Sequence, residues 1–363
     1  MFELIYFIFL CGYFIQTIML IIGSSKKFPK LKDENLPSVS IIVAARNEEE
    51  NILECLTSLN NLEYPDNKLE IIIVDDKSTD KTGQIIDDFI QDKPRFQKIV
   101  TKKEIGILKG KTNALANGIE ISNGDIILTT DADCTFPSTW AKTLASYYIK
   151  DVGIVNGFTT QKAFDQFSGM QSIDFIYLLM AAAGTMNLGH PISCIGNNMS
   201  YRRKAYDEVG GYEKLPFSVT EDFQLLNSIY KTKKYKIILP LNPDSLVTTK
   251  PLPDIKSLYK QKKRWGVGGL GVPIRGYFVM LFGFITNLAV LATPFFYSRE
   301  WMIYTIFKIF IDYLAMYTIH SHLGIKKNLK YFPIYELYFL FYVVALPFSI
   351  GFNRRVTWKG RQY

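Results

Sequence analysis

Five short motifs rich in acidic and polar residues occur in order between residues 40 and 265, and their side chains suit phosphate, metal and proton chemistry. They are Ala45-Arg46-Asn47-Glu48, Val74-Asp75-Asp76, Asp131-Ala132-Asp133, Thr220-Glu221-Asp222 and Gln261-Lys262-Lys263-Arg264-Trp265. Each motif alone is weak, because an Asp-x-Asp arises by chance about once in a chain of this size. As an ordered set they predict a site that binds a nucleotide-sugar through a divalent cation and keeps a separate carboxylate as a base.

Alternating strands and helices surround the first three motifs. Short apolar, β-branched runs at 39–45, 69–74 and 125–130 predict buried parallel strands, and helices are predicted over 48–59 and 81–90. This alternation predicts an α/β fold with a mostly parallel sheet and helices on both faces. In such sheets ligands bind at the carboxyl ends of the strands, which is where the first three motifs lie.

The acids that follow these strands supply oxygen ligands for a hard cation. Asp131 and Asp133 are the predicted ligands of Mg²⁺ or Mn²⁺, which would bridge the phosphate oxygens of the nucleotide. Glu48 and Asp76 are predicted to contact the base and ribose, and Lys111 to bring a positive charge to the nucleotide. The alternative is that Asp131 and Asp133 are ordinary turn residues, since Asp is common in turns.

The two later motifs predict the catalytic base and the contacts of the leaving group. Asp222 opens a predicted helix over 223–230 and is the predicted base, because attack on an anomeric carbon requires a group that accepts the proton of the acceptor hydroxyl. Gln261, Arg264 and Trp265 share one face of a helix. We expect Arg264 to pair with the diphosphate and Trp265 to stack on the acceptor. A second interpretation, which is compatible with these contacts, is an interfacial amphipathic helix whose basic residues contact lipid headgroups.

Residues 37–265, which carry these motifs, resemble the membrane-bound family 2 glycosyltransferases, including their ceramide glucosyltransferase-like and processive polysaccharide synthase-like members. The resemblance implies a GT-A fold, a UDP-sugar donor and inversion at the anomeric carbon by single displacement. It implies nucleotide contacts at Glu48, Asp76 and Lys111, metal binding at Asp131 and Asp133, a base at Asp222, and leaving-group or acceptor contacts at Gln261, Arg264 and Trp265. The sequence contains no phosphate-loop or Gly-x-Gly-x-x-Gly motif, which argues against ATPases and dinucleotide-binding enzymes.

Apolar segments at both ends of the chain predict helices that span a membrane. Residues 1–23 are almost wholly apolar, and three further stretches lie at about 276–297, 301–320 and 331–351. Lysines follow the first segment, so the positive-inside rule predicts an outward N-terminus and a cytoplasmic catalytic domain at a bacterial inner membrane. A cleaved signal peptide or a buried core helix is the alternative, but the flanking charge fits neither.

The later charges conflict with four simple spans. Three spans after the catalytic domain would place the C-terminus outside, whereas Lys326, Lys327, Lys330 and the basic tail at 353–363 favour the inside. One of the C-terminal stretches is therefore expected to be re-entrant or interfacial. Asp312 lies in the second of these stretches, and we expect it to pair with Lys308 one turn away.

These boundaries predict six regions along the chain. They are an N-terminal transmembrane helix (1–23), a basic juxtamembrane linker (24–36), a GT-A catalytic domain (37–250), an amphipathic interfacial helix with Gln-x-x-Arg-Trp and a Gly-rich turn (251–272), about three membrane segments (273–352) and a basic tail (353–363). Loops such as 156–197 are expected to set sugar specificity and show no readable pattern.

Composition narrows the partners and leaves three functions open. The chain is 48% hydrophobic with a net charge of +8, which favours an anionic membrane surface over nucleic acid. Its four scattered cysteines predict neither a zinc site nor a disulfide framework. We expect transfer of a sugar to a membrane lipid at the cytoplasmic face. The alternatives are a processive synthase of a β-linked polysaccharide, for which the membrane helices are few, and a membrane scaffold that is catalytically dead.

Overall fold

The computed structural model describes residues 2–101, 104–106, 108–216, 218 and 220–352, together with the backbone of the short strands β10 (Thr357–Trp358) and β11 (Arg361–Gln362). The side chains of the basic tail predicted over 353–363 lie outside the described residues. The chain folds into two compact units. The sheet unit comprises residues 27–160 and 194–250, and the helical unit comprises residues 1–26, 161–193 and 251–363.

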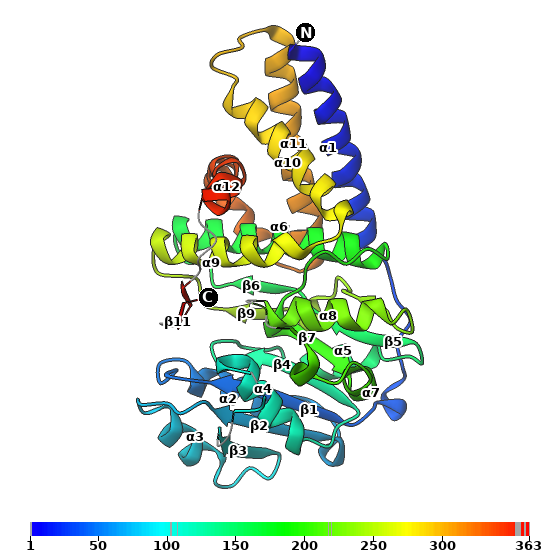
Figure 1. The fold of residues 1–363 in the computed structure, drawn as a ribbon, viewed down its shortest axis with the longest axis vertical. Helices are drawn as coiled ribbons and strands as arrows, with labels where there is room; N and C mark the ends of the chain where they lie inside the picture. The colour runs from blue at the N-terminus through cyan, green and yellow to red at the C-terminus, as the bar shows by residue number, and fades with distance from the viewer. Residues whose placement is uncertain are drawn as a thin grey trace. The chain divides into compact units, whose positions relative to one another are not determined.

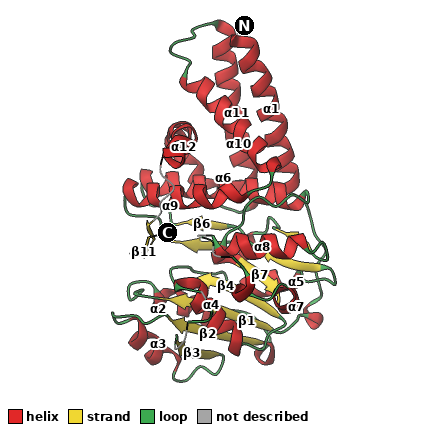
Figure 2. Cartoon of the chain, viewed as in Figure 1, coloured by secondary structure: helices red, strands yellow, loops and turns green. Residues whose placement is uncertain are grey.

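The main sheet of the sheet unit has the strand order β3-β2-β1-β4-β7-β5-β8 (Figures 1 and 2). Its strands are β1 (Val39–Ala45), β2 (Leu69–Asp75), β3 (Phe96–Val100), β4 (Ile126–Asp131), β5 (Val152–Asn156), β7 (Met199–Arg202) and β8 (Lys236–Ile238). β1, β2, β3 and β4 are parallel, whereas β7 runs antiparallel to both β4 and β5. This pairing confirms the predicted mostly parallel sheet. Its β-branched central runs are buried on both faces, as is typical of parallel strands covered by helices.

Helices cover both faces of this sheet, since successive side chains of a strand point to opposite sides. On one face, Ile41 and Ile71 share a hydrophobic core with Leu56 of α2 (Ile52–Asn60). On the other, a Cβ added to Gly118 of α4 would lie 2.7 Å from Ile42, so only glycine allows the helix to approach this closely. The remaining elements of this unit are α3 (Thr82–Ile90), α4 (Gly110–Ile121), α5 (Trp140–Ser146), α7 (Arg203–Glu208) and α8 (Glu221–Lys231), and β6 (Thr159–Gln161) pairs with β9 (Val247–Thr249).

The helical unit is assembled from three separated segments of the chain. Its helices are α1 (Phe2–Ser24), α6 (Gln166–Asn187), α9 (Ile255–Gly268), α10 (Ile274–Leu291), α11 (Arg299–His322) and α12 (Phe332–Phe352). α1 packs along α6, α10 and α11, and α12 packs against α6, α9 and α10. The assignment of 156–197 to loops is wrong for α6, which is buried on nearly all sides and therefore lacks the polar face that marks a surface helix.

The expected glycine-rich turn is shorter than the sequence predicts. α9 continues through Gly268, and only Gly269–Gly271 form a separate short 3-10 helix before α10. Gly266 lies inside α9 against the side chains of Leu346 and Ile350 of α12. The first glycine of the run therefore serves close helix packing, because a Cβ at that position would collide with Ile350.

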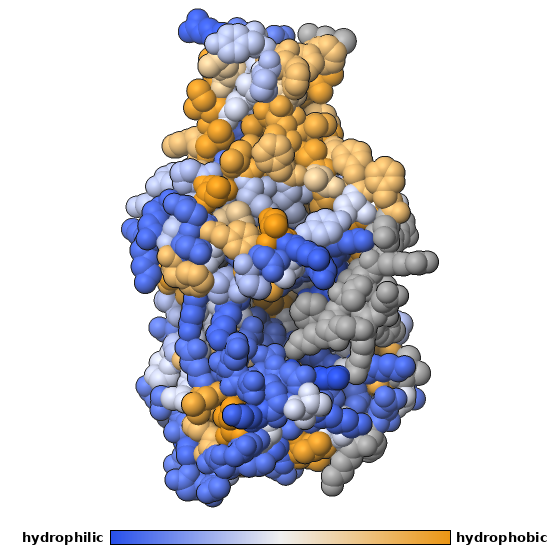
Figure 3. All heavy atoms as spheres, turned by 90° about the vertical axis from the view of Figure 1, so that its left-hand side faces the viewer, coloured by the Kyte–Doolittle hydropathy of each residue, from blue (hydrophilic) through white to orange (hydrophobic). Residues whose placement is uncertain are grey.

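Four segments of the helical unit are long and apolar enough to cross a membrane. Within the described residues they are α1, α10, α11 and the segment Lys326–Phe352, which contains α12. Figure 3 shows hydrophobic surface gathered over the helices of this unit, while the surface of the sheet unit is mostly hydrophilic. Large exposed apolar patches mark interaction with a membrane or a partner, and apolar helices of this length match the thickness of the hydrocarbon core of a bilayer.

A buried polar network links three of these helices. Lys308 and Asp312 of α11 form the predicted ion pair, with 2.8 Å between Nζ and Oδ2. Lys308 also contacts Glu336 of α12 at 2.6 Å, and the Tyr13 hydroxyl of α1 donates to Asp312 Oδ1 at 2.7 Å. All four side chains are buried. Asp312 therefore has a structural role as predicted, in a larger network than its spacing from Lys308 indicated.

Candidate functional site

The register of the sheet brings the first three motifs to one edge. Ala45 at the end of β1 lies opposite Asp75 of β2, and Ala44 lies opposite Asp131 of β4. The loops that carry Glu48, Asp76 and Asp133 consequently leave the sheet beside one another, at the carboxyl ends of the parallel strands.

The loops after β1 and β2 are tied together by their polar groups. Asn47 has a left-handed φ of 54°, which is uncommon for a residue with a side chain. The backbone N–H of Glu48 donates to the Thr82 hydroxyl at 2.7 Å, and the Arg46 guanidinium lies 3.9 Å from the Asp76 carboxylate. These contacts hold the two predicted nucleotide-binding acids in place at the rim of the sheet.

The carboxylates after β4 are held by side chains from distant parts of the chain. Asp131 pairs with Lys111, which lies in the first turn of α4, and the Lys111 ammonium is 3.9 Å from Glu221 of α8. The hydroxyl of Thr249 in β9 donates to Asp133 Oδ2 at 3.0 Å. Thr249 was not predicted, because a threonine more than a hundred residues from its partner carries no signal in the sequence.

The charges of this cluster perturb one another. Burial raises the pKa of Asp133, and the neighbouring charges of Asp131 and Glu48 raise it further. Burial opposes the charge of Lys111, but Asp131, Glu221 and Asp222 together outweigh it and raise the pKa of the ammonium. In the part of this cluster that the structure describes, the carboxylates of Asp131, Asp133, Glu221 and Asp222 outnumber the ammonium of Lys111, so the cluster favours an additional cation.

Asp222, the predicted base, lies within the electrostatic reach of Lys111. It is the second residue of α8, and its Oδ1 accepts a hydrogen bond from the backbone N–H of Phe223 at 2.8 Å. A Cβ added to Gly196 would lie 3.2 Å from Asp222 Oδ2, so the glycine leaves room for this carboxylate. Thr220, which precedes the helix, makes no side-chain cap.

Asp131 and Asp133 fit a metal that binds together with a nucleotide. Among the described residues, no group of three or more His, Cys, Asp and Glu side chains is arranged to hold a metal without other ligands. Two carboxylates alone suit Mg²⁺ or Mn²⁺, because such ions take oxygen ligands and share them with substrate phosphates and water. The raised pKa of Asp133 also indicates a carboxylate pair that a cation would stabilise.

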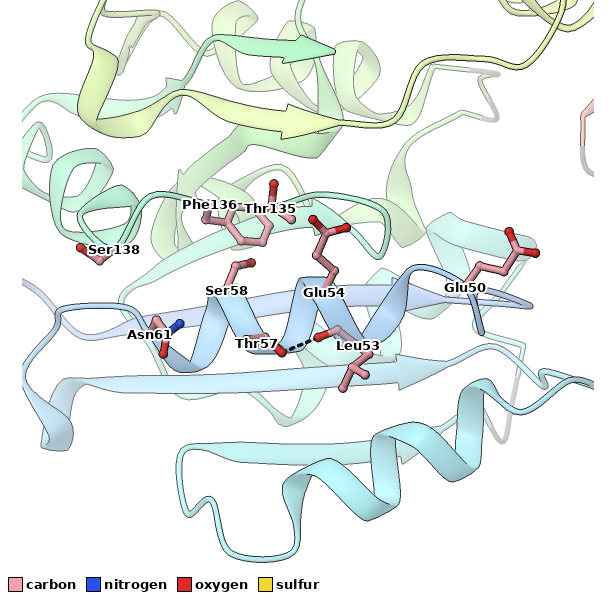
Figure 4. A pocket seen from close by; sticks show the side chains of 9 residues that line it. All are labelled: Glu50, Leu53, Glu54, Thr57, Ser58, Asn61, Thr135, Phe136 and Ser138. Carbon is pink, nitrogen blue, oxygen red and sulfur yellow. Dashed lines mark hydrogen bonds between the residues drawn. The ribbon is translucent and has the colours of Figure 1, made fainter. Parts of the chain in front are cut away.

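An open pocket of about 670 Å³ lies beside this cluster on the sheet unit (Figure 4). It is lined by Glu50, Leu53, Glu54, Thr57, Ser58 and Asn61 from the segment that contains α2, and by Thr135, Phe136 and Ser138. In Figure 4 the Glu54 side chain rises from α2 toward Thr135. None of the predicted site residues lines this pocket.

Gln261, Arg264 and Trp265 lie on α9, which belongs to the helical unit. Asp254 caps the helix by accepting a hydrogen bond from the Ser257 N–H at 2.8 Å. The ring of Trp265 packs against Phe175 of α6, with 5.7 Å between centroids.

Lys262, in the same motif, is buried and does not contact solvent or lipid as the interfacial interpretation assumed. It pairs with Asp174 of α6, and its ammonium lies 4.8 Å from the Trp265 ring centre and 5.2 Å from that of Tyr342. The sequence did not indicate Asp174, because its partner is 88 residues away. This pair fixes α9, and with it Trp265, against α6.

Two families of glycosyltransferases match the chain. The profile of glycosyl transferase family group 2 matches residues 126–321, more than half of the chain, and that of glycosyl transferase family 2 matches residues 40–210. The chain belongs to the family 2 glycosyltransferases. As a family 2 enzyme it acts on nucleotide-sugars, and the motif order predicted this assignment.

Curated relatives of this family 2 enzyme differ in their products. The chain is 29% identical to the "Probable glycosyltransferase YdaM" of Bacillus subtilis over 92% of this chain and 74% of that protein. It is 28% identical to the β-monoglucosyldiacylglycerol synthase of Synechocystis over 64% of this chain, and spans about half (48%) of that relative. It is 26% identical to a poly-β-1,6-N-acetyl-D-glucosamine synthase of Staphylococcus epidermidis over 91% of this chain and 78% of that protein.

A solved structure supports the fold of this family 2 enzyme. The mannosyltransferase PcManGT from Pyrobaculum calidifontis, determined in complex with GDP-Man and Mn²⁺, matches with a TM-score of 0.62 at 17% identity. The match covers 93% of this chain and 99% of that one. The predicted GT-A fold with apolar helices at both ends is confirmed.

Proposed function

We propose that this enzyme transfers a sugar, with inversion, from a nucleotide-sugar to a membrane lipid at the cytoplasmic face of a bacterial inner membrane. We expect the donor to be a UDP-sugar. The observation that carries the proposal is the cluster at the strand ends of the sheet unit, in a family 2 enzyme whose other unit carries four membrane-length apolar segments. Nucleotide site, metal ligands and base thus accompany a membrane anchor in one chain.

Each predicted residue has a role in this reaction. Asp131 and Asp133 would hold the divalent cation, which when bound neutralises charge on the departing diphosphate. Glu48 and Asp76 contact the nucleobase and ribose of the donor, and Lys111 contributes a positive charge to the nucleotide site. PcManGT was solved with GDP-Man and Mn²⁺, which supports a nucleotide-sugar donor and a divalent cation. The expectation of uridine in place of guanosine rests on the resemblance to the family.

Asp222 acts as the base. Its carboxylate accepts the proton of the acceptor hydroxyl while that oxygen attacks the anomeric carbon and the bond to the diphosphate breaks. One displacement inverts the anomeric configuration. In the helical unit, Gln261, Arg264 and Trp265 contact the leaving diphosphate or the acceptor, as the resemblance of their motif implies.

A lipid acceptor is favoured by the apolar surface of the helical unit and by the relative named as a β-monoglucosyldiacylglycerol synthase. The second candidate is a processive polysaccharide synthase. It is favoured by the similarity to a poly-β-1,6-N-acetyl-D-glucosamine synthase, which extends over 91% of this chain. The two candidates share a donor site and differ in whether the product stays attached to lipid.

One transfer assay separates the candidates. Membranes that contain the protein are incubated with radiolabelled UDP- and GDP-sugars and Mn²⁺ or Mg²⁺, and the label is divided between organic-soluble and alcohol-precipitable fractions. We expect metal-dependent label in the organic phase. Label confined to high-mass precipitable material would establish the polymer synthase and overturn the lipid acceptor.

Two variants control this assay. Asp222→Asn removes the base and is expected to lower transfer about 10²- to 10⁴-fold. Asp88→Asn replaces an exposed acid of α3 away from the cluster and should leave transfer unchanged. Equal activity in the two variants would refute the role of Asp222.

A further inference from the structure

Helix α12 is long and apolar enough to span a bilayer, but it is arranged differently from the other apolar helices of its unit. In Figure 1, α1, α10 and α11 run lengthwise, whereas α12 is seen nearly end-on and therefore crosses their direction. α12 packs against α6, α9 and α10. The four apolar segments therefore do not form a simple bundle of parallel spans.

The C-terminal half of α12 contacts α9, which runs across it in Figure 1. The ring of Tyr342 is 5.2 Å from the Lys262 ammonium, and the Ser349 hydroxyl contacts that of Tyr259. Further along α9, Gly266 lies against Ile350. These contacts extend over most of α9, from its first half to its last turn.

The charge of α9 restricts where this pair of helices can lie. α9 carries five basic residues, Lys256, Lys260, Lys262, Lys263 and Arg264. Lys262 is buried and paired with an acid, whereas Lys256 and Lys260 are exposed.

Burying α9 in the bilayer would therefore be costly. A charged side chain at the bilayer centre is strongly disfavoured because it loses its hydration, and this applies to Lys256, Lys260 and Lys263 together. α9 contacts the C-terminal half of α12, and both helices run across the direction of α1, α10 and α11 in Figure 1. Both helices are therefore expected at the membrane surface.

The large hydrophobic side chains that α12 exposes form one apolar stripe. They are Ile334, Leu337, Phe341, Phe348 and Phe352, with exposed fractions from 36% to 90%. Their spacing of three, four, seven and four residues places them on a single face of the helix. The opposite face, with Tyr335, Glu336 and Phe339, is buried in the helical unit. A helix with one packed face and one apolar face exposed along its length suits a position in the interface of a bilayer.

The flanking charges agree with such a position. If α1, α10 and α11 span the membrane, α11 ends on the side where the sheet unit follows α1 in the chain. Lys326, Lys327 and Lys330 come next, and the positive-inside rule assigns them to that side. A helix that stays in the interface leaves the basic tail after residue 352 on the same side, which removes the conflict in the sequence.

We infer that α12 lies in the plane of the membrane, with the stripe from Ile334 to Phe352 inserted among the phospholipids of the leaflet that faces the sheet unit. Three helices then span the bilayer, and residues before and after α12 share one side. This inference concerns the membrane arrangement and does not depend on the donor, the acceptor or catalysis.

Thiol labelling of the full-length protein tests the topology. Cys11 and Cys194 are replaced by Ser, while Cys55 and Cys134 remain because they are fully buried. Single cysteines are introduced as Tyr297→Cys in the exposed α10–α11 loop, Lys327→Cys before α12 and Tyr363→Cys after it. They are probed with a membrane-impermeant maleimide before and after permeabilisation of cells.

We expect the cysteine at 297 to react in intact cells, and those at 327 and 363 to react only after permeabilisation. Opposite accessibility of 327 and 363 would show that α12 spans and would overturn the inference. If 327 and 363 react together in intact cells and 297 does not, α12 still lies in the plane, and the cytoplasmic placement under the proposed function is wrong instead.

A second measurement identifies what covers the stripe. A bimane label on Phe341→Cys, in the same background and in phosphatidylglycerol-containing vesicles, is exposed to lipids that carry quenchers at shallow or deep positions. We expect shallow quenchers to reduce the fluorescence more strongly than deep ones. Stronger quenching by deep quenchers would mean a spanning helix, and no quenching would mean that protein, such as a second copy, covers the stripe. Either result would overturn the inference.

Discussion

Replacing one member of the Asp174–Lys262 pair is expected to destabilise the helical unit strongly, and replacing both members is expected to cost little. Both side chains are 2% exposed, and each is the charged partner of the other. Burial raises the pKa of Asp174 and lowers that of Lys262, so the site penalises both charges. The pair persists because each charge compensates for the other.

The magnitude follows from this burial. Removal of one partner leaves an uncompensated buried charge, which costs about 3–5 kcal/mol, whereas exchange of both partners for apolar residues of similar size is often neutral. Asp174→Leu and Lys262→Met should each show the large loss. The double variant should regain most of this stability. A residual loss of about 0.5–2 kcal/mol is expected, because the ammonium no longer contacts the rings of Trp265 and Tyr342.

The assay is thermal unfolding of the detergent-solubilised protein, followed for the two single variants and the double variant. At about 2 °C per kcal/mol, the single variants should lower the midpoint by roughly 6–10 °C and the double variant by less than about 4 °C. Asp92→Leu, which removes an exposed partner of Lys93, is the matched control and should have little effect. Additive losses in the double variant would refute the reasoning, because they would mean that the two side chains act independently.

Three further perturbations have defined outcomes. Gly196→Ala places a methyl group 3.2 Å from Asp222 Oδ2 and should lower kcat in the transfer assay about tenfold with an unchanged unfolding midpoint; an unchanged kcat would show that the base tolerates displacement. Asp131→Asn should raise the Mn²⁺ concentration for half-maximal transfer at least about tenfold, by analogy with lost metal contacts elsewhere; an unchanged Mn²⁺ titration would remove Asp131 from the metal site. Lys308→Met leaves Glu336 without its cation and should cost about 3–5 kcal/mol, measured as lower thermal stability in detergent; wild-type stability would mean that the network is dispensable.

The sheet and its edge were predictable because their signals are local. Each central strand is a short β-branched run followed directly by an acidic motif, so strand and site residue occur within a few positions of each other. The register then places Asp76 and Asp133 after the ends of β2 and β4, on either side of β1. Parallel topology alone was enough to predict that these acids share one edge of the sheet.

The helical unit was less predictable because its contacts are distant in sequence. α6 is buried on most sides and shows no helical pattern of polar residues, so the sequence over 156–197 does not indicate a helix. Asp174, Glu336 and Thr249 each have partners that sequence spacing does not indicate. Hydropathy and length assign α12 to the same class as α1, α10 and α11, and its direction depends on packing that hydropathy does not report.

The contact between α1 and α6 has a consequence for biosynthesis. Gly23 of α1 and Gly184 of α6 touch backbone to backbone, so neither position accepts a side chain, and the Asn187 amide donates to the Gly23 carbonyl at 3.0 Å. α1 ends at residue 24 and α6 begins at residue 166. At about 5–20 residues per second, α1 is synthesised roughly 10–30 s before the helix that covers its glycine. α1 must therefore persist without its partner α6 while most of the sheet unit is translated, and the association of these two helices follows the synthesis of α6.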